Sequence, residues 1–333
     1  MTDHGTIAET GEISRMNRSQ EEPAFAAQLE RHRRELHIHC YRMLASFDDA
    51  EDAVQDAFLR AWKYRDSRDE AVPVRPWLYR IATNACLDLI ARDRKRPAIS
   101  DDGTGEPGEI TWLQPYPDAL LELVAPREGE PDAIVVTKET IELAFLTVIQ
   151  LLTPPQRAAL ILCDVLGWSA AEAAATLDTT VASVNGALQR ARATLRKHLP
   201  SRKEWPTGVD ATEAERELVR KFVEASENAD MSWFASVIRE DAVFRMPPEP
   251  GETVGRDAMM QLWVEGGFGT SMQLEGVPTR ANRQPAVAFY NHGEAMALDV
   301  IRIEEGMITE VITFPGSVFE EFGLPSKLQG NLR

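Results

Sequence analysis

The sequence predicts a multidomain protein in which two all-α helical domains precede a C-terminal α+β domain. Apolar residues recur at steps of three and four between residues 23 and 97, and again from about 133 to 200, as in helices that bury one face. After about residue 211, short apolar runs typical of strands take over. A chain of 333 residues is long enough for two or three such domains.

The net charge of −17 argues at first against nucleic-acid binding, which needs cationic patches. Its distribution removes the objection. Residues 98–133 hold 9 acidic and 1 basic residue, a net of −8, and residues 211–333 hold 20 acidic and 11 basic, a net of −9; together these give −17. The two helical parts are therefore close to neutral, and their cations are bunched.

The first helical part contains two amphipathic helices. One carries apolar residues from Ala50 to Trp62, and the next carries them from Val74 to Leu89 before a basic string that ends at Pro97. Residues 1–22 are polar and predict a disordered tail. Residues 98–132 combine five prolines with many acids and predict an extended linker.

The second helical part has a helix-turn-helix layout. We expect one helix from about residue 133 to Leu152, and a second that starts at Thr153-Pro154-Pro155 and runs to Gly167. A short Ala-rich helix, Ser169–Leu177, and a longer basic helix, Thr180–Leu199, follow across a tight turn.

The basic helix has the chemistry of a DNA-binding element. No acidic residue occurs between Thr180 and Lys203, and arginines spaced along a helix suit phosphates. Asn185, Gln189 and Arg190 carry groups that pair with base edges. A solvated charged helix explains the arginines alone about equally well, but the turn and the Ala-rich helix before it favour insertion into a groove.

The C-terminal part, after a linker at 201–210, is α+β. It begins with helices at Glu213–Asn228 and Met231–Ile238, and continues with the strand-like runs DAVFRM, AVAFY, AMALDVIRI and MITEVITF. We place this domain at 211–325, with a tail at 326–333. The absence of a long apolar run and of a basic, apolar N-terminus predicts a cytoplasmic protein without a membrane span.

Three segments carry a family resemblance. SFDDAEDAVQDAFLRAW, RPWLYRIATNACLDLIARDRKRP and LTPPQRAALILCDVLGWSAAEAAATLDTTVASVNGALQRARATLRKHL resemble regions 2 and 4 of sigma-70 family RNA polymerase sigma factors, in the extracytoplasmic-function group. The resemblance places region 2 at 23–97 and region 4 at 133–200. It implies a protein that binds core RNA polymerase at its clamp and flap, recognises the promoter and directs initiation, without being an enzyme.

The resemblance also assigns roles to residues. Those implied to bind polymerase are Asp52, Gln55, Asp56 and Arg60. Those implied to act on the -10 element are Arg75, Trp77, Tyr79, Arg80 and Asn84. Those implied to read the -35 element are Ser183, Asn185, Gly186, Gln189, Arg190, Arg192 and Arg196.

Two of these assignments need qualification. Trp77 lies on the apolar stripe, so core packing explains it equally well, whereas Tyr79 and Arg80 lie off the stripe and are the better candidates. Many family members have Arg-Ser where this chain has Asn185-Gly186. The base preference at -35 therefore does not carry over.

His37, His39 and Cys40 invite a metal interpretation, but residues two apart on a helix point to different faces and no second cluster completes four ligands. We expect packing and polymerase contact there instead. No metal or cofactor is implied anywhere, and the three scattered cysteines predict free thiols.

The C-terminal part resembles the SnoaL-like group of cone-shaped α+β folds, through its helix pair, DAVFRMPPEPGETVGRDAMMQLW, QPAVAFYNHG and VITFPGSVFEEFGLP. This implies an apolar pocket that could hold a small ligand, with candidate residues Asp241, Trp263, His292 and Asp299. Some members of the group are enzymes with an Asp and a His, yet aspartates at strand ends and histidines in turns are usually structural.

Two other functions stay open at this point. One is a repressor that binds DNA through the helix-turn-helix and a ligand through the cone, which would not need Asp52, Gln55 and Asp56. The other is a SnoaL-like enzyme whose N-terminal domains regulate it. Under the sigma factor reading, we expect the acidic C-terminal domain to modulate activity by shielding or docking on the DNA-binding helices, and an anti-sigma factor is a further partner to test.

Overall fold

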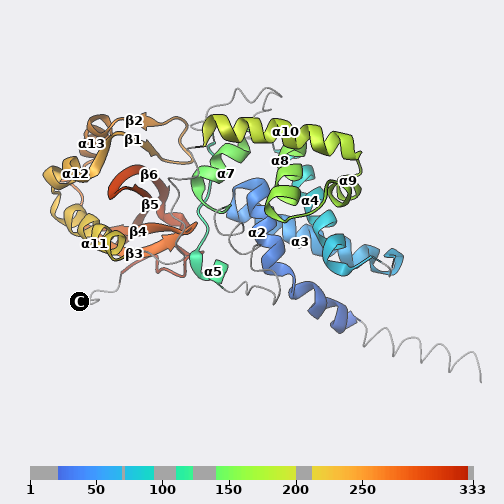
Figure 1. The fold of residues 1–333 in the computed structure, drawn as a ribbon. Helices are drawn as coiled ribbons and strands as arrows, with labels where there is room; N and C mark the ends of the chain where they lie inside the picture. The colour runs from blue at the N-terminus through green and yellow to red at the C-terminus, as the bar shows by residue number, and fades with distance from the viewer. Residues whose placement is uncertain (1–21, 70–71, 94–109, 123–139, 200–211, 329–333) are drawn as a thin grey trace, which may run out of the picture.

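The computed structural model of the chain describes residues 22–69, 72–93, 110–122, 140–199 and 212–328. The expected tail over the first 21 residues, the end of the basic string and the 201–210 linker lie outside these ranges. A helical body and a sheet-containing body lie side by side (Figure 1). The fold class expected from the sequence is confirmed.

The first helical unit is built from α2 (Arg33–Leu44), α3 (Phe47–Tyr64) and α4 (Val74–Arg92). The hydroxyl of Ser46 caps α3 by accepting a hydrogen bond from the Asp49 N–H at 3.2 Å. The apolar stripe predicted on α3 is confirmed in its small residues, since Ala50, Ala53, Val54, Ala57 and Ala61 are all fully buried.

The described residues of the second helical unit form four helices. These are α7 (Leu143–Gln150), α8 (Pro154–Leu160) with a π-helical turn at Ile161–Val165, α9 (Ala170–Thr176) and α10 (Val181–His198). The helix expected from about residue 133 begins only at Leu143 among the described residues. Ile141 is buried in the turn before it, because this turn lies between the helical body and the sheet.

Over residues 212–328, the C-terminal unit is a mixed six-stranded sheet with three α-helices. The helices are α11 (Glu213–Asn228), α12 (Met231–Val237) and α13 (Arg256–Glu265). The strands are β1 (Ile238–Arg245), β2 (Thr253–Val254), β3 (Leu274–Ala281), β4 (Gln284–Asn291), β5 (Glu294–Glu304) and β6 (Met307–Pro315). The strand order is β2-β1-β6-β5-β4-β3, with β1 parallel to β6 and all other pairs antiparallel.

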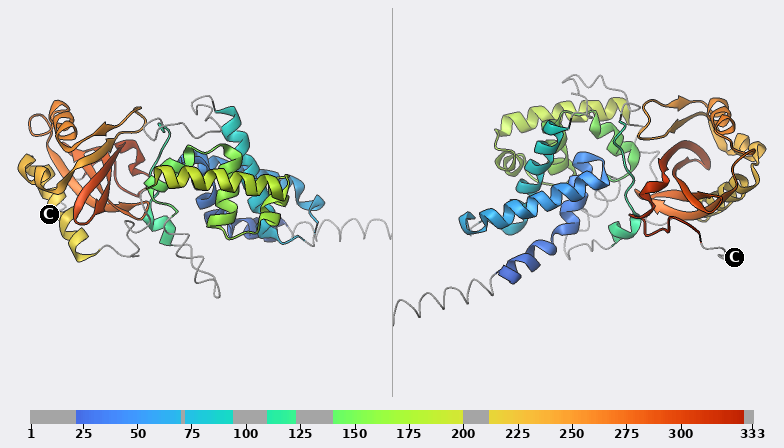
Figure 2. Two further views of the ribbon diagram at one scale, coloured as in Figure 1. Left: turned by 45° about the horizontal axis from the view of Figure 1, so that its top comes forward. Right: turned by 180° about the vertical axis from the view of Figure 1, so that it is seen from behind.

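Both faces of this sheet are buried. Along β4, Val287 and Phe289 pack with the domain's own helices, while Ala288 and Tyr290 belong to the core that continues into the helical body. The helices α11 to α13 lie on the side of the sheet away from that body, as the views of Figure 2 also show. The sheet is therefore sandwiched between its own helices and the rest of the protein.

The stretch expected as an extended linker, 98–132, is corrected for residues 110–122. Ile110, Leu113 and Tyr116 are buried, and residues Asp118–Glu122 form the short helix α5. Residues 110–122 contain aromatic and apolar side chains between their prolines. These side chains pack between the helical body and the sheet, and their burial explains why the segment has a defined structure. The remainder of the stretch lies outside the described residues.

Candidate functional site

The turn between α9 and α10 has the local structure of a helix-turn-helix. Ser169 and Glu172 cap the start of α9, and the Thr180 hydroxyl caps α10 by accepting from the Ser183 N–H at 3.1 Å. Alanines at the crossing, Ala173 and Ala187, let the two helices approach closely. The opposite face of α10 is thereby directed to solvent.

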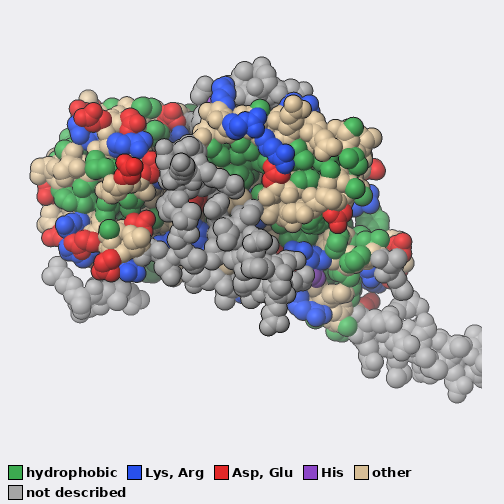
Figure 3. Space-filling model, in the orientation of Figure 1, with side chains coloured by type: hydrophobic (Ala, Val, Ile, Leu, Met, Phe, Trp, Pro, Cys, Tyr) green, Lys and Arg blue, Asp and Glu red, His purple; other side chains and the backbone are tan. Residues whose placement is uncertain are grey.

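The residues expected to read the -35 element lie on the exposed part of α10, apart from the half-buried Gly186. Asn185, Gln189, Arg190 and Arg196 are exposed. Lys and Arg side chains form a band over this helix in Figure 3. These positions can therefore present amide and guanidinium donors to DNA in this structure.

Two of the -35 candidates have intramolecular partners. The hydroxyl of Ser183 lies 2.9 Å from that of Thr180. Arg192 donates to both carboxylate oxygens of Asp164, at 2.6 and 2.9 Å, and this bidentate contact raises the pKa of the guanidinium. Asp164 therefore competes with phosphate for Arg192.

The face of α3 expected to bind polymerase is only partly free. Asp52 and Gln55 are exposed, whereas Arg60 forms ion pairs with Asp56 at 2.6 Å and with Asp88 at 2.8 Å. Arg60 thus ties α3 to α4.

Leu59 lies on the same exposed side of α3, and 68% of its surface is open to solvent. The sequence reasoning missed this residue. A leucine outside the apolar stripe, among polar neighbours, was the available signal.

Tyr79, expected to act on the -10 element from its place off the apolar stripe, is buried in this structure. Its side chain is 2% exposed, its hydroxyl donates to Glu35 at 3.3 Å, and its ring packs against His39 and Trp168. Trp168 comes from the second helical unit, so burial of Tyr79 depends on a partner that the pattern of one helix cannot reveal.

The other -10 candidates are more accessible. Arg80 and Asn84 are exposed on α4. Trp77 is half-buried, with the Arg68 guanidinium 5.9 Å from its ring, and Arg75 pairs with Glu35 at 2.8 Å.

A buried arginine also joins the two helical units. Arg157, at the start of α8, is 2% exposed and donates to the carbonyl of Met43 in α2 at 2.6 Å. It also donates to the carbonyls of Ile149, Gln150 and Leu152 at 2.9–3.1 Å. Carbonyl groups at the C-terminal ends of α2 and α7 thus surround its positive charge, which the dipoles of these two helices also favour.

His37, His39 and Cys40 are buried in α2, and among the described residues no group of three or more metal-ligating side chains converges. Burial lowers the pKa of His37 to about 4 and that of His39 to about 3. The ring of His37 contacts the Tyr116 hydroxyl at 3.0 Å, and that of His39 contacts Thr83 at 2.9 Å. Both histidines are neutral packing residues in this structure.

The turn between β3 and β4 inserts into the helical body. Asn282, fully buried with a φ of 54°, donates through Nδ2 to the Tyr41 hydroxyl at 2.8 Å and to the Ile141 carbonyl at 2.7 Å. Its Oδ1 accepts from the Tyr116 N–H at 2.7 Å. One side chain therefore links both helical units and the segment between them.

Neighbouring residues reinforce this contact. Asp118 in α5 accepts from the Arg283 N–H at 2.7 Å and from Arg280 at 3.1 Å, and Gln284 accepts from the Leu143 N–H at 3.1 Å. We call the contacts of residues 280–284 with the helical body the hairpin contact.

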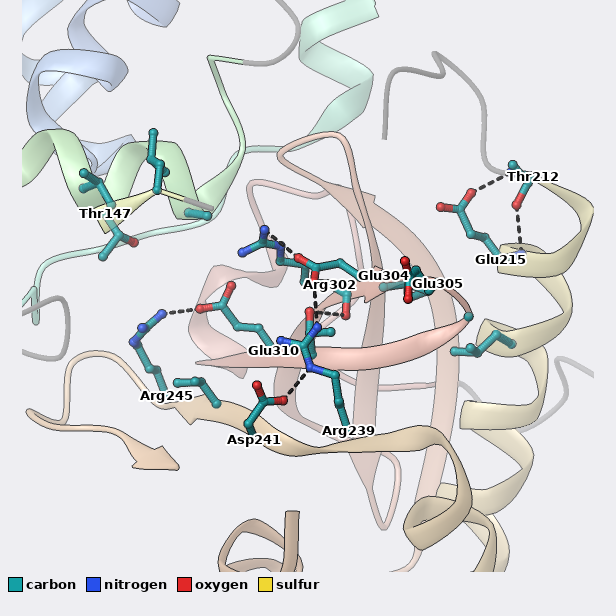
Figure 4. A pocket seen from close by; sticks show the side chains of 18 of the residues that line it. Thr147, Thr212, Glu215, Arg239, Asp241, Arg245, Arg302, Glu304, Glu305 and Glu310 are labelled. Atoms are coloured by element: carbon teal, nitrogen blue, oxygen red, sulfur yellow. Dashed lines mark hydrogen bonds and ion pairs between the residues drawn. The ribbon is translucent and has the colours of Figure 1, made fainter. Parts of the chain in front are cut away.

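A cavity of about 910 Å³, lined by several charged side chains, lies between α7, the end of α10, the start of α11 and the strands β1, β5 and β6 (Figure 4). Its arginines pair with acids of the same cavity: Arg239 with Asp241 and Glu304, and Arg245 with Glu310. Asp241 lies here, ion-paired and largely exposed, rather than in the interior of the cone.

A second cavity, of about 720 Å³, lies inside the cone and is mainly apolar. Trp263 and Asp299 both line it. His292 is exposed in the turn between β4 and β5 and lines neither cavity. The structure therefore does not bring Asp241, His292 and Asp299 together as an acid–base set.

Among the residues that the structure describes, no helix is both long and apolar enough to cross a membrane.

Comparison with known proteins agrees with this architecture. The family descriptions of sigma-70 region 2 and sigma-70 region 4 match residues 29–96 and 142–195. The extracytoplasmic-function RNA polymerase sigma factor SigG of Mycobacterium tuberculosis is 35% identical over 321 residues, which cover 91% of this chain and 85% of SigG. SigW of Bacillus subtilis is 30% identical over 182 residues, covering 54% of this chain and 90% of SigW.

The crystal structure of the extracytoplasmic-function sigma factor SigJ of M. tuberculosis has the same fold. It superimposes with a TM-score of 0.59 at 21% sequence identity, covering 91% of this chain and all of SigJ. Together with the two sigma-70 regions and the match to SigG along nearly the whole chain, these findings place the chain in the extracytoplasmic-function family of RNA polymerase sigma factors.

Proposed function

We propose that three exposed faces carry the sigma activity of this protein. The face of α3 with Asp52, Gln55 and Leu59 binds core polymerase, the face of α4 with Arg80 and Asn84 acts on the -10 element, and α10 reads the -35 element. Regions 23–97 and 133–200 are the corresponding functional units. As a member of this family, the protein binds core RNA polymerase and promoter DNA to direct initiation.

One observation supports the proposal most strongly. Asn185, Gln189 and Arg190 are exposed together on α10, immediately after a tight turn, with Arg196 further along the helix. Amides and guanidinium groups at the start of a second helix are the groups that read base edges, and arginines further along suit phosphates.

The test is promoter binding and run-off transcription by the full chain with core polymerase. Gln189→Ala is expected to weaken initiation at the cognate -35 sequence and to reduce discrimination at one base pair, because a base-edge contact is worth about 1–3 kcal/mol. Gln261→Ala, at an exposed glutamine of α13, is the matched control and is expected to behave as the wild type. Unchanged base preference in Gln189→Ala would exclude this residue from readout.

We further infer that the C-terminal domain restrains the sigma domains in a closed arrangement. The hairpin contact supports this, since Asn282 bonds to groups of both helical units. The -10 and -35 elements lie about 25 base pairs apart, which is about 85 Å at 3.4 Å per base pair. In this structure the two helical units are in direct contact, with the ring of Tyr79 packed on that of Trp168. The two units therefore cannot occupy both elements without separating. Asn185, Gln189 and Arg190 are exposed among the described residues, so this inference rests on the hairpin contact and not on shielding of α10.

The experiment for this inference is a distance measurement between labels at Leu59 and Lys197 in the full chain. Asn282→Ala removes three side-chain hydrogen bonds, so we expect a larger population of long distances than in the wild type. Asn228→Ala, at a residue that bonds only within α11, serves as control. Identical distributions in all three proteins would show that the hairpin contact does not hold the arrangement closed.

Enzymatic activity is not favoured by this geometry. The sigma factor family is not a family of enzymes, and the titratable candidates Asp241, His292 and Asp299 are dispersed over three environments.

A further inference from the structure

The cavity inside the cone has the walls of a binding site for a flat or polycyclic apolar group. Its aromatic lining residues include Phe222, Phe234, Phe244, Trp263, Phe268 and Phe289. Tilted and edge-to-face contacts hold these rings, with centroids 5.3 Å apart for Phe234 and Trp263 and 6.0 Å apart for Phe222 and Phe289. A rigid aromatic wall binds an apolar body without first having to be ordered.

The charges of the lining select the polar part of a ligand. Asp299, Glu249 and Glu265 line the cavity, and no Lys, Arg or His is among its lining residues. An anionic ligand would find repulsion and no countercharge. A cation would find both a carboxylate and aromatic faces, which attract cations within about 6 Å of a ring centroid.

Asp299 places a carboxyl group in this mainly apolar lining. It lies in the middle of β5, opposite Thr313 of β6, whose hydroxyl donates to Asp299 Oδ1 at 2.6 Å. Among the described residues no cation pairs with Asp299. Burial raises the pKa of this carboxyl to about 6, which reflects the cost of a negative charge without a countercharge.

We propose that this cavity is the binding site for a hydrophobic amine, whose ammonium group pairs with Asp299 while its ring system packs against the aromatic wall. The ligand supplies the positive charge that the site lacks, so the pair forms in a setting of low dielectric constant. This inference concerns a ligand site of the C-terminal domain and does not depend on the assignment of the DNA-binding faces.

The cavity is open to such a molecule. Met246, in the loop after β1, and Leu262, on α13, both line it and are 43% and 38% exposed. Glu249 and Glu265 belong to the same two segments. An organic cation would therefore meet acidic side chains on entry, before it reaches Asp299.

The test uses three fluorescent probes with one ring system: 1-pyrenemethylamine, 1-pyrenemethanol and 1-pyrenecarboxylate. Near neutral pH they carry an ammonium, a neutral hydroxyl and a carboxylate. Fluorescence anisotropy with the full chain is expected to show the amine binding at least about tenfold more tightly than the alcohol, since one close charge pair is worth this much or more. The carboxylate is expected to bind more weakly than either.

Two variants locate the effect. Asp299→Asn keeps the size of the side chain and its acceptor for Thr313, and is expected to abolish the preference for amine over alcohol while leaving alcohol binding unchanged. Asp241→Asn changes an aspartate of the other cavity and is expected to retain the preference. Equal binding of amine and alcohol to the wild type would overturn the proposal without reference to any variant, and so would a preference that survives in Asp299→Asn.

Discussion

At the scale of single residues, Asp299 and Arg157 are two charged groups in apolar surroundings that differ in the partners they have. Asp299 and Arg157 represent opposite cases. Arg157 has acceptors for its guanidinium in both helical units, whereas Asp299 has one neutral hydroxyl. The charge of Arg157 stabilises the fold through its partners. The charge of Asp299 destabilises the fold, and we attribute its presence to the ligand site proposed above.

The cost of Asp299 predicts a pH dependence. A carboxyl whose pKa rises from 3.8 in the unfolded chain to about 6 in the folded protein favours folding when protonated, and this contribution is lost as the pH rises from about 4 through 6. Asp299→Asn removes the titration. At about pH 4 the two proteins share this contribution, whereas at pH 8 the wild type has lost it. We therefore expect the free energy of unfolding of the variant, relative to that of the wild type, to increase by about 1–3 kcal/mol from about pH 4 to pH 8.

Urea unfolding of both proteins at the two pH values checks this, because all other groups titrate alike in the pair. A difference between variant and wild type that does not change with pH would mean that the carboxyl is not buried in the folded state.

Arg157 predicts a loss of stability. Arg157→Met keeps much of the apolar stem but leaves carbonyls of α2 and α7 without their donor, so we expect a loss of about 3 kcal/mol or more. Arg216→Met on α11, where the ion pair is exposed, is expected to change stability by less than about 0.5 kcal/mol. Thermal unfolding of both variants measures the difference, and equal melting temperatures would refute the role given to Arg157.

At the scale of elements, the helices follow from the sequence more closely than the strands do. The cap at Thr180 and the apolar stripe of α3 predict α10 and α3 within a few residues. The strand β3 was not predicted, because Gly276 and Pro278 interrupt its pattern. Proline is tolerated there because β3 is an edge strand. The position of a strand within the sheet cannot be recognised from its own sequence.

The Asp164–Arg192 pair couples the π-helical turn after α8 to α10, and it yields a prediction for DNA binding. Asp164→Asn removes the bidentate partner of an exposed arginine, so we expect tighter binding to duplex DNA at low salt. The slope of log affinity against log salt should steepen by about one. Asp257→Asn in the C-terminal domain is the control. An unchanged slope for Asp164→Asn would mean that Arg192 does not reach phosphate.

At the scale of the whole molecule, three units share one closed arrangement that the sequence predicts only in part. Their identity and order follow from the motifs and patterns of the chain. The burial of Tyr79 under Trp168, the ordering of residues 110–122 and the insertion of Asn282 all arise where different units meet. The helical period of one segment carries no information about such contacts, so it placed Tyr79 off the apolar stripe although its side chain is buried. For the same reason, the sequence did not reveal that Asp241, His292 and Asp299 lie in three different places.

The most direct test of the sigma function and its restraint by the C-terminal domain is run-off transcription with core RNA polymerase on a library of genomic fragments, comparing the full wild-type chain with Asn282→Ala. We predict discrete start sites only when the protein is added, and more transcript from the variant because its sigma domains separate more readily. Absence of initiation with either protein, despite stable binding to duplex DNA, would contradict this prediction, and so would a variant whose output is equal to or lower than that of the wild type.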